Sequence, residues 1–283
     1  MSVGAQQSNA LDPESFKAIA ELAYQESGLT LAQEKSSMIQ SRLRHRLRDL
    51  GLPNFAAYSS LLQSDRGHEE RRHLISALTT NVSHFFREKH HYDTLTEELA
   101  KRLPALREGG QMRIWSAGCS NGQEALSAAI ALLEASPEIA TLNLKILGTD
   151  IDPAVVQFAR AGIYPERLMG GVPKPLIDKY FTEATPDGSE RSFAAKPVLT
   201  QMIQFNELNL LARWPMSKRF DIIFCRNVVI YFDLQTQTKL WPRMKDALAP
   251  DGILFLGHSE RIADPASFGF DCTGPTTYRP RVG

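Results

Sequence analysis

The fold of this chain is decided by residues 113–129, RIWSAGCSNGQEALSAA. The first five residues are typical of a short buried strand, and from Gln123 onward the apolar residues follow helical spacing. Residues 118–122, GCSNG, then form a turn between a strand and a helix. In open α/β sheets such a turn lies at the carboxyl edge of the strands, where glycines admit a ligand and the helix offers free N–H groups. The stretch therefore predicts a ligand-binding turn.

The same strand, turn and helix pattern continues to the end of the chain, which predicts an α/β fold with a mostly parallel sheet wrapped by helices. Further strands are expected at residues 144–150, 202–208, 220–227 and 253–260, with a helix at 153–162. Residues 164–201 contain GGVPKP and TPDGSERS and are too long for a plain connection, so they predict a small inserted β-subdomain. The tail, residues 268–280, predicts an antiparallel hairpin that closes one sheet edge.

The first part of the chain predicts helices only. Asp12 and Pro13 signal a helix start, Gly28 signals its end, and further helices are expected at about 33–50, after Asn54, and at about 69–78. A longer connecting helix should end before Pro104, and Pro242 should kink a later helix. The predicted domains are a helical N-terminal domain (residues 1–84), a connector (85–110) and an α/β domain (111–283).

Composition excludes several classes of protein. Among 283 residues, Lys plus Arg equals Asp plus Glu at 32 each, so no excess charge favours nucleic acid or a membrane surface. The three cysteines are odd in number and far apart, which suits neither a zinc site nor a disulfide framework, and we expect no metal. No apolar run reaches the length of a membrane span, and the N-terminus lacks signal-peptide features. We expect a cytoplasmic monomer without membrane insertion.

Two carboxylates indicate which ligand the turn binds. The turn lacks G-x-G-x-x-G, and Glu124 at the helix start would repel a pyrophosphate but attract a sulfonium or ammonium group. Asp150, at the end of the second predicted strand, is placed to accept from ribose hydroxyls. Together they suggest S-adenosylmethionine. Taken singly, Glu124 could complement a helix dipole and Asp150 could cap the next helix.

Six motifs, in order and spacing, resemble the chemotaxis receptor methyltransferases of the CheR family. They are NVSHFFRE (81–88), WSAGCSNGQE (115–124), GTDID (148–152), NLL (209–211), FDIIFCRNVVIYF (220–232) and GHSE (257–260). The resemblance implies a helical N-terminal domain and a Rossmann-like S-adenosylmethionine-dependent methyltransferase domain with a small inserted β-subdomain. It also implies methyl transfer to glutamates in the cytoplasmic helical domain of methyl-accepting chemotaxis receptors, with S-adenosylhomocysteine as the other product.

The resemblance also carries site residues to this chain. The implied cofactor contacts are Asn81, Ser83, Arg87, Glu124, Asp150, Asn209, Leu210, Arg226 and Asn227. Ser83 replaces a threonine common in the family, and Gln123-Glu124 replaces an acidic pair. We expect Tyr231 and Arg226 to orient the acceptor carboxylate, which needs no general base because it is ionised at neutral pH.

A basic helix is the candidate receptor-binding surface. Four arginines, Arg42, Arg44, Arg46 and Arg48, flank an apolar stripe and could steer an acidic helical partner. The alternative is a solvated helix face, and composition alone favours it. His90 and His91 are expected on a helix surface. Other functions left open are a nicotinamide oxidoreductase, a methyltransferase for small molecules or nucleic acid, and a non-catalytic adaptor.

Overall fold

A computed structural model of the chain describes residues 10–185 and 190–281. By internal contacts the chain divides into two compact units, residues 1–80 with 231–233, and residues 81–230 with 234–283. The sequence features expected at the N-terminus (residues 1–9) and within TPDGSERS (residues 186–189) lie outside the described residues.

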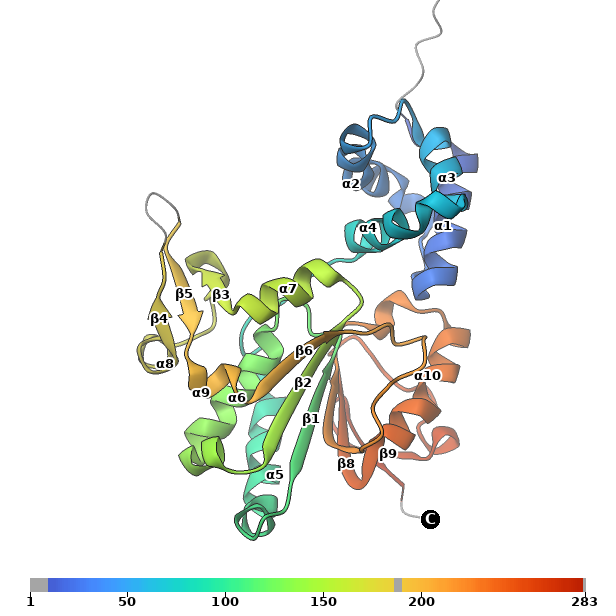
Figure 1. Cartoon of the computed structure of the whole chain (residues 1–283). Coiled ribbons are helices and arrows are strands. Elements are labelled where there is room, and N and C mark those ends of the chain that lie inside the picture. The colour runs from blue at the N-terminus through green and yellow to red at the C-terminus, as the bar shows by residue number, and fades with distance from the viewer. Residues whose placement is uncertain (1–9, 186–189, 282–283) are drawn as a thin grey trace, which may run out of the picture. The chain divides into compact units, whose positions relative to one another are not determined.

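The first unit is helical, as the sequence predicts. Its described part contains α1 (Pro13–Ser27), α2 (Ser36–Asp49), α3 (Phe55–Gln63) and α4 (His68–Leu78), coloured blue to cyan in Figure 1. The Asp12 side chain caps α1 by accepting from Ser15 N at 2.9 Å, and α1 ends at Gly28, whose φ is 74°. All four helices bury apolar side chains, including Ile19, Ile39, Leu43, Phe55, Tyr58 and Leu74, and α4 contacts each of the other three helices.

The second unit is built on a seven-stranded sheet in the order β6-β2-β1-β7-β8-β10-β9. Its strands are β1 (Met112–Ala117), β2 (Leu144–Asp150), β6 (Ile203–Glu207), β7 (Phe220–Cys225), β8 (Leu248–Leu256), β9 (Phe270–Gly274) and β10 (Thr277–Pro280). Strands β6, β2, β1, β7 and β8 are parallel, and β9 and β10 form the predicted antiparallel hairpin beside β8. The carboxyl ends of β6, β2, β1 and β7 therefore share one sheet edge.

Helices cover the sheet of the second unit. They are α5 (Lys89–Arg107), α6 (Gln123–Ala135), α7 (Pro153–Ala161) and α10 (Leu234–Ala247), and Figure 1 shows α5 and α6 on one side of the sheet and α10 on the other. The prediction that the connecting helix ends before Pro104 is wrong, because α5 continues to Arg107. Its last turn buries Leu106, which offsets the hydrogen bond that proline cannot donate. Helix α10 contains Pro242 in its interior, and the expected kink there stays a prediction.

The insertion forms a second, three-stranded sheet in the order β3-β5-β4. It contains β3 (Ile163–Pro165), α8 (Lys174–Tyr180), β4 (Phe181–Glu183) and β5 (Ser192–Ala195), and α9 (Pro197–Thr200) leads back to β6. The hydroxyl of Tyr164 donates to Asn121 O at 2.6 Å, so the insertion is bonded directly to the turn after β1. This architecture confirms the predicted fold class.

Candidate functional site at the carboxyl edge of the sheet

The turn between β1 and α6 depends on its two glycines. Gly118 and Gly122 have φ values of 83° and 82°, which side-chain-bearing residues rarely adopt. A Cβ on Gly118 would lie 2.3 Å from Val228 Cγ2, and a Cβ on Gly122 would lie 2.8 Å from Phe205 Cζ. The predicted turn is therefore present, and its glycines are required both by backbone conformation and by close packing.

Asp150 holds this turn from the neighbouring strand. One carboxylate oxygen accepts from Ser120 N at 2.8 Å and the other accepts from Asp152 N at 3.0 Å. Asp150 is 7% exposed, and burial raises the pKa of its carboxyl. The cap of α7 is not Asp150 but Asp152, whose side chain accepts from Ala154 N. Asp150 is thus a buried acceptor at the place where a ribose contact is expected.

The segment that begins with Asn81 lies against the same turn. The Asn81 amide donates to Asp152 Oδ2 at 2.7 Å, and the Ser120 hydroxyl donates to Asn81 O at 3.1 Å. Ser83 is partly buried. Asn81 is therefore positioned by both the β1–α6 turn and the β2–α7 turn, and its contact with the cofactor stays a prediction.

Glu124 and Arg226 form a buried ion pair. Glu124 accepts from Ser116 Oγ at 2.6 Å and from Arg226 Nε at 2.7 Å. The other guanidinium nitrogens of Arg226 donate to Arg87 O at 2.5 Å and to Tyr92 Oη at 3.2 Å. Burial by itself lowers the pKa of Arg226, but the negative charge of Glu124 raises it above the ordinary value.

This ion pair bears on the predicted roles of Glu124 and Arg226. Glu124 already has a cation in contact, so its charge is balanced inside the protein rather than by a ligand. The Arg226 side chain is 2% exposed and its donors are engaged, so its contacts do not support direct orientation of an acceptor carboxylate. The geometry instead indicates that Arg226 fixes the first turn of α6.

Glu260, for which the sequence predicts no role, organises the turn after β7. Asn227 has a φ of 59°, and its N–H and that of Gly257 both donate to Glu260 Oε2 at 2.7 Å. Ile230 N donates to Glu260 Oε1 at 3.2 Å. Burial raises the pKa of Glu260, and these hydrogen bonds oppose the shift. Glu260 belongs to the GHSE motif, which was its only signal in the sequence.

The remaining predicted site residues are Asn209 and Leu210, which follow β6, and Tyr231, which follows β7. Leu208 N donates to Asp150 O, and the Asn209 side chain accepts from Leu211 N, both at 2.8 Å. Leu210 is buried. Tyr231 ends a short 3₁₀ helix and groups by its contacts with the helical unit, where its carbonyl accepts from Thr30 N at 2.9 Å. Its role toward an acceptor remains a prediction.

The prediction that His91 lies on the helix surface is wrong, because its side chain is fully buried. His91 Nδ1 lies 3.3 Å from Arg226 Nη1 and 3.4 Å from Glu88 Oε2, and Nε2 lies 3.1 Å from Thr276 Oγ1. Two of these neighbours, Arg226 and Thr276, come from segments far away in sequence, which no local pattern could indicate.

In the helical unit, the four predicted receptor-binding arginines divide into two kinds. Arg42 donates to Leu78 O and Thr79 O at 2.9 and 3.1 Å, closing the end of α4. Arg46 forms a two-pronged ion pair with the buried Glu70. Arg42 and Arg46 are thus partly buried and bonded within the unit, whereas Arg44 and Arg48 are exposed.

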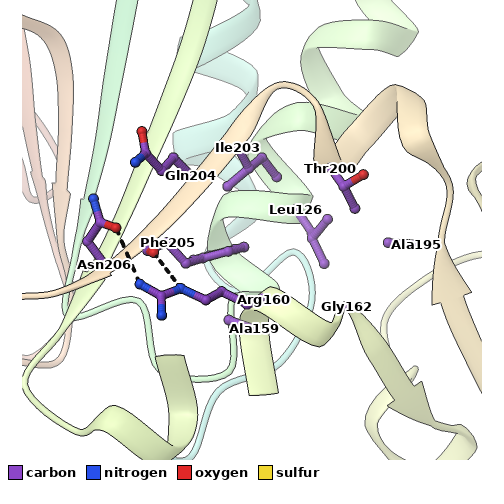
Figure 2. A pocket seen from close by; sticks show the side chains of 10 residues that line it. All are labelled: Leu126, Ala159, Arg160, Gly162, Ala195, Thr200, Ile203, Gln204, Phe205 and Asn206. Carbon is purple, nitrogen blue, oxygen red and sulfur yellow. Dashed lines mark hydrogen bonds between the residues drawn. The ribbon is translucent and has the colours of Figure 1, made fainter. Parts of the chain in front are cut away.

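A pocket of about 370 Å³ lies beside β6, and Figure 2 shows its lining. Arg160 crosses it and donates to Phe205 O at 2.9 Å. Its ten lining residues include none of the predicted cofactor contacts.

In the described part of the chain, no group of three or more His, Cys, Asp or Glu side chains could hold a metal ion. None of the described helices combines the length and apolarity needed to cross a membrane.

The mostly parallel sheet and the polar residues at its carboxyl edge fit the S-adenosylmethionine-dependent methyltransferase expected from the sequence, and comparison with known families identifies that class. Residues 81–277 match the CheR methyltransferase, SAM binding domain, and residues 14–79 match the CheR methyltransferase, all-alpha domain. The chain therefore belongs to the CheR methyltransferase family.

Curated relatives match over most of both chains. A probable chemotaxis protein methyltransferase of Rhizobium etli is 44% identical, covering 91% of this chain and 96% of the relative. The chemotaxis protein methyltransferase of Escherichia coli is 38% identical over 95% and 91%. A solved S-adenosylmethionine-dependent methyltransferase from Mesorhizobium loti is 19% identical, covering 55% of this chain and 52% of that one, with a TM-score of 0.30. As a member of the CheR methyltransferase family, the chain is a methyltransferase whose cofactor is S-adenosylmethionine.

Proposed function

We propose that this protein transfers the methyl group of S-adenosylmethionine to glutamate side chains in the cytoplasmic helical domain of methyl-accepting chemotaxis receptors. The main support for this proposal is the family match. Both domains match the CheR family, and relatives named chemotaxis protein methyltransferase align over nearly their full length. The products are a glutamate methyl ester and S-adenosylhomocysteine.

The residues at the carboxyl edge fit this cofactor. Asp150 is a buried carboxylate that keeps lone pairs for ribose hydroxyls beyond its two backbone N–H donors. Polar side chains lie in the adjoining turns, with Asn81 bonded to Asp152 and Asn209 following Leu208, whose N–H donates to Asp150 O; the glycine turn lacks the pyrophosphate fingerprint. This donor set suits a nucleoside without phosphates and disfavours the nicotinamide alternative. We assign Asp150 to the ribose and Asn81, Ser83, Asn209 and Asn227 to the rest of the cofactor, while the Glu124–Arg226 ion pair holds the first turn of α6.

The reaction needs little proton transfer from the protein. When bound, the sulfonium group supplies an activated methyl group. A glutamate side chain, with an unperturbed pKa of about 4.3, is already an anionic nucleophile at neutral pH. The protein's task is to align the acceptor with the methyl group and to exclude water, as expected of a site without a general base. Each turnover replaces one receptor carboxylate with a neutral ester.

The decisive experiment is incubation with radiolabelled S-adenosylmethionine and membranes that contain candidate receptors. Base-labile methyl esters should appear on the receptor and should disappear when its acceptor glutamates are replaced by glutamine. Label that appears on nucleic acid or small molecules but not on receptor would reject the proposal, and cofactor binding without any transfer would favour the adaptor alternative.

We further propose that the exposed arginines of α2 steer the acidic receptor surface. Arg44→Glu and Arg48→Glu should raise the apparent KM for receptor, with S-adenosylmethionine affinity unchanged, and the effect should shrink at high salt. Lys17→Glu, at an exposed cation of α1 in the same unit, is the matched control. If all three variants and wild type have the same KM for receptor, the arginines do not steer the receptor and form only a solvated helix face. Arg42 and Arg46 are unsuitable probes because both have internal partners.

A further inference from the structure

The Glu260 carboxylate joins the turns that follow two neighbouring strands. It accepts N–H groups from Asn227 and Ile230 after β7 and from Gly257 after β8. Glu260 is 3% exposed, so each of these donors would lose its partner in a dry environment if the carboxylate were removed. The side chain therefore acts as a clamp on the backbone rather than as one half of an ion pair.

The clamped turn is in contact with the cofactor loop. Val228, one residue after Asn227, packs so closely on Gly118 that a Cβ there would lie 2.3 Å from Val228 Cγ2. Arg226, one residue before Asn227, bonds to Glu124 in the first turn of α6. Movement of this turn would therefore displace both ends of the β1–α6 turn.

We propose that Glu260 is a positioning residue for cofactor binding, which holds the Arg226–Ile230 segment in the conformation that shapes the β1–α6 turn. Glu260 touches neither cofactor nor acceptor in this role, and it acts through Val228 and Arg226. The inference rests on the proposed location of the S-adenosylmethionine site at this edge, but not on the identity of the methyl acceptor.

The first test replaces the clamp without changing its size. In Glu260→Gln one oxygen becomes an NH₂ group, which cannot accept from a backbone N–H. We expect the Kd for S-adenosylmethionine, measured by calorimetry, to rise about tenfold, because small displacements of binding groups have large effects. The matched control is Glu98→Gln, which removes another buried carboxylate, one bonded to Lys101, Arg102 and Arg279. It should lower Tm and leave the Kd unchanged.

A second variant disturbs the clamp without touching its charge. A Cβ on Gly257 would lie 2.7 Å from Asn227 Nδ2 and 2.8 Å from Glu260 Oε2, so Gly257→Ala should push the two apart. We expect weaker cofactor binding here too, and a less than additive effect in the double variant because both changes act on one contact. Gly274→Ala, where a Cβ meets Thr277 at an ordinary 3.7 Å, is the control.

The outcomes separate the alternatives. Weaker binding in Glu260→Gln and Gly257→Ala, with unchanged binding in both controls, supports the positioning role, as does a raised KM for cofactor at nearly unchanged kcat. Unchanged affinity in a folded Glu260→Gln, or an equal loss in Glu98→Gln, overturns it. Asp150→Ala measured alongside keeps the tests distinct: if it alone weakens binding, the site stands and the role of Glu260 is rejected.

Discussion

His91 should make the stability of the second unit depend on pH near neutrality. Arg226 is a permanent donor 3.3 Å from Nδ1, so this nitrogen must accept and the proton resides on Nε2, next to Thr276. Glu88, 3.4 Å from Nδ1, would favour a second proton, but burial and the Arg226 charge oppose it. Burial, followed by the charges of Arg226 and His90, lowers the pKa of His91 to about 3.

The sign and size of the effect follow from this lowered pKa. Between the ordinary value of 6.5 and about 3, the unfolded chain binds a proton at His91 that the folded chain does not. The free energy of unfolding therefore falls as pH falls, by at most about 1.36 kcal/mol per pH unit. From pH 7 to pH 5 the loss is about 1.9 kcal/mol. That corresponds to a Tm decrease of roughly 4–8 °C.

The assay is urea or thermal unfolding of wild type, His91→Gln and His90→Gln at pH 7, 6 and 5. Glutamine can accept from Arg226 and donate to Thr276 but does not titrate, so His91→Gln should lose the pH-dependent part of the decrease. His90→Gln, at the exposed neighbouring position, should follow wild type. Parallel pH dependence of wild type and His91→Gln would refute the reasoning, as would a rise in wild-type stability from pH 7 to 6.

Three further outcomes are expected. Asp150→Ala should cost roughly 1.5–3 kcal/mol of S-adenosylmethionine affinity by calorimetry, and an unchanged Kd would remove Asp150 from the site. Arg46→Ala leaves Glu70 buried without its cation and should destabilise the helical unit by about 3 kcal/mol in urea unfolding; a loss near zero would identify a screened surface pair. Gly118→Ala adds a close contact at 2.3 Å to the strain at φ 83°, so it should lower Tm more than Gly51→Ala, where only the strain applies, and equal losses would contradict this account.

Local chemistry made most of the fold predictable. Asp12, Pro13 and Gly28 set the ends of α1 because capping and left-handed backbone depend on residues within one turn. The alternation of strands and helices from residue 112 gave the parallel sheet for the same reason. The predicted helix end before Pro104 was wrong, because burial of Leu106 outweighs the hydrogen bond that proline lacks. Such burial is a property of the tertiary structure and cannot be seen in the local sequence.

The candidate site was less accessible to sequence reasoning. The sequence located Asp150 and the glycine turn, which lie at strand ends, but the partner of Glu124 is 102 residues away in Arg226. The burial of His91 and the bonds of Glu260 to Asn227 and Ile230 also depend on residues distant in sequence, so the sequence did not predict them. Arg42 and Arg46 were indistinguishable from Arg44 and Arg48 in the sequence, since their bonds to the end of α4 and to Glu70 depend on the tertiary position of α4.

The placement of β10 beside β8 has a consequence for how the protein is synthesised. Ile253, Leu254, Phe255 and Leu256 of β8 are completely buried, and β10 supplies the strand that covers their open edge. Without Thr277–Pro280, the edge of β8 would be unpaired, and its backbone N–H and C=O groups could pair with other chains. Premature termination just before β10 should therefore yield an aggregating product rather than a slightly shortened enzyme.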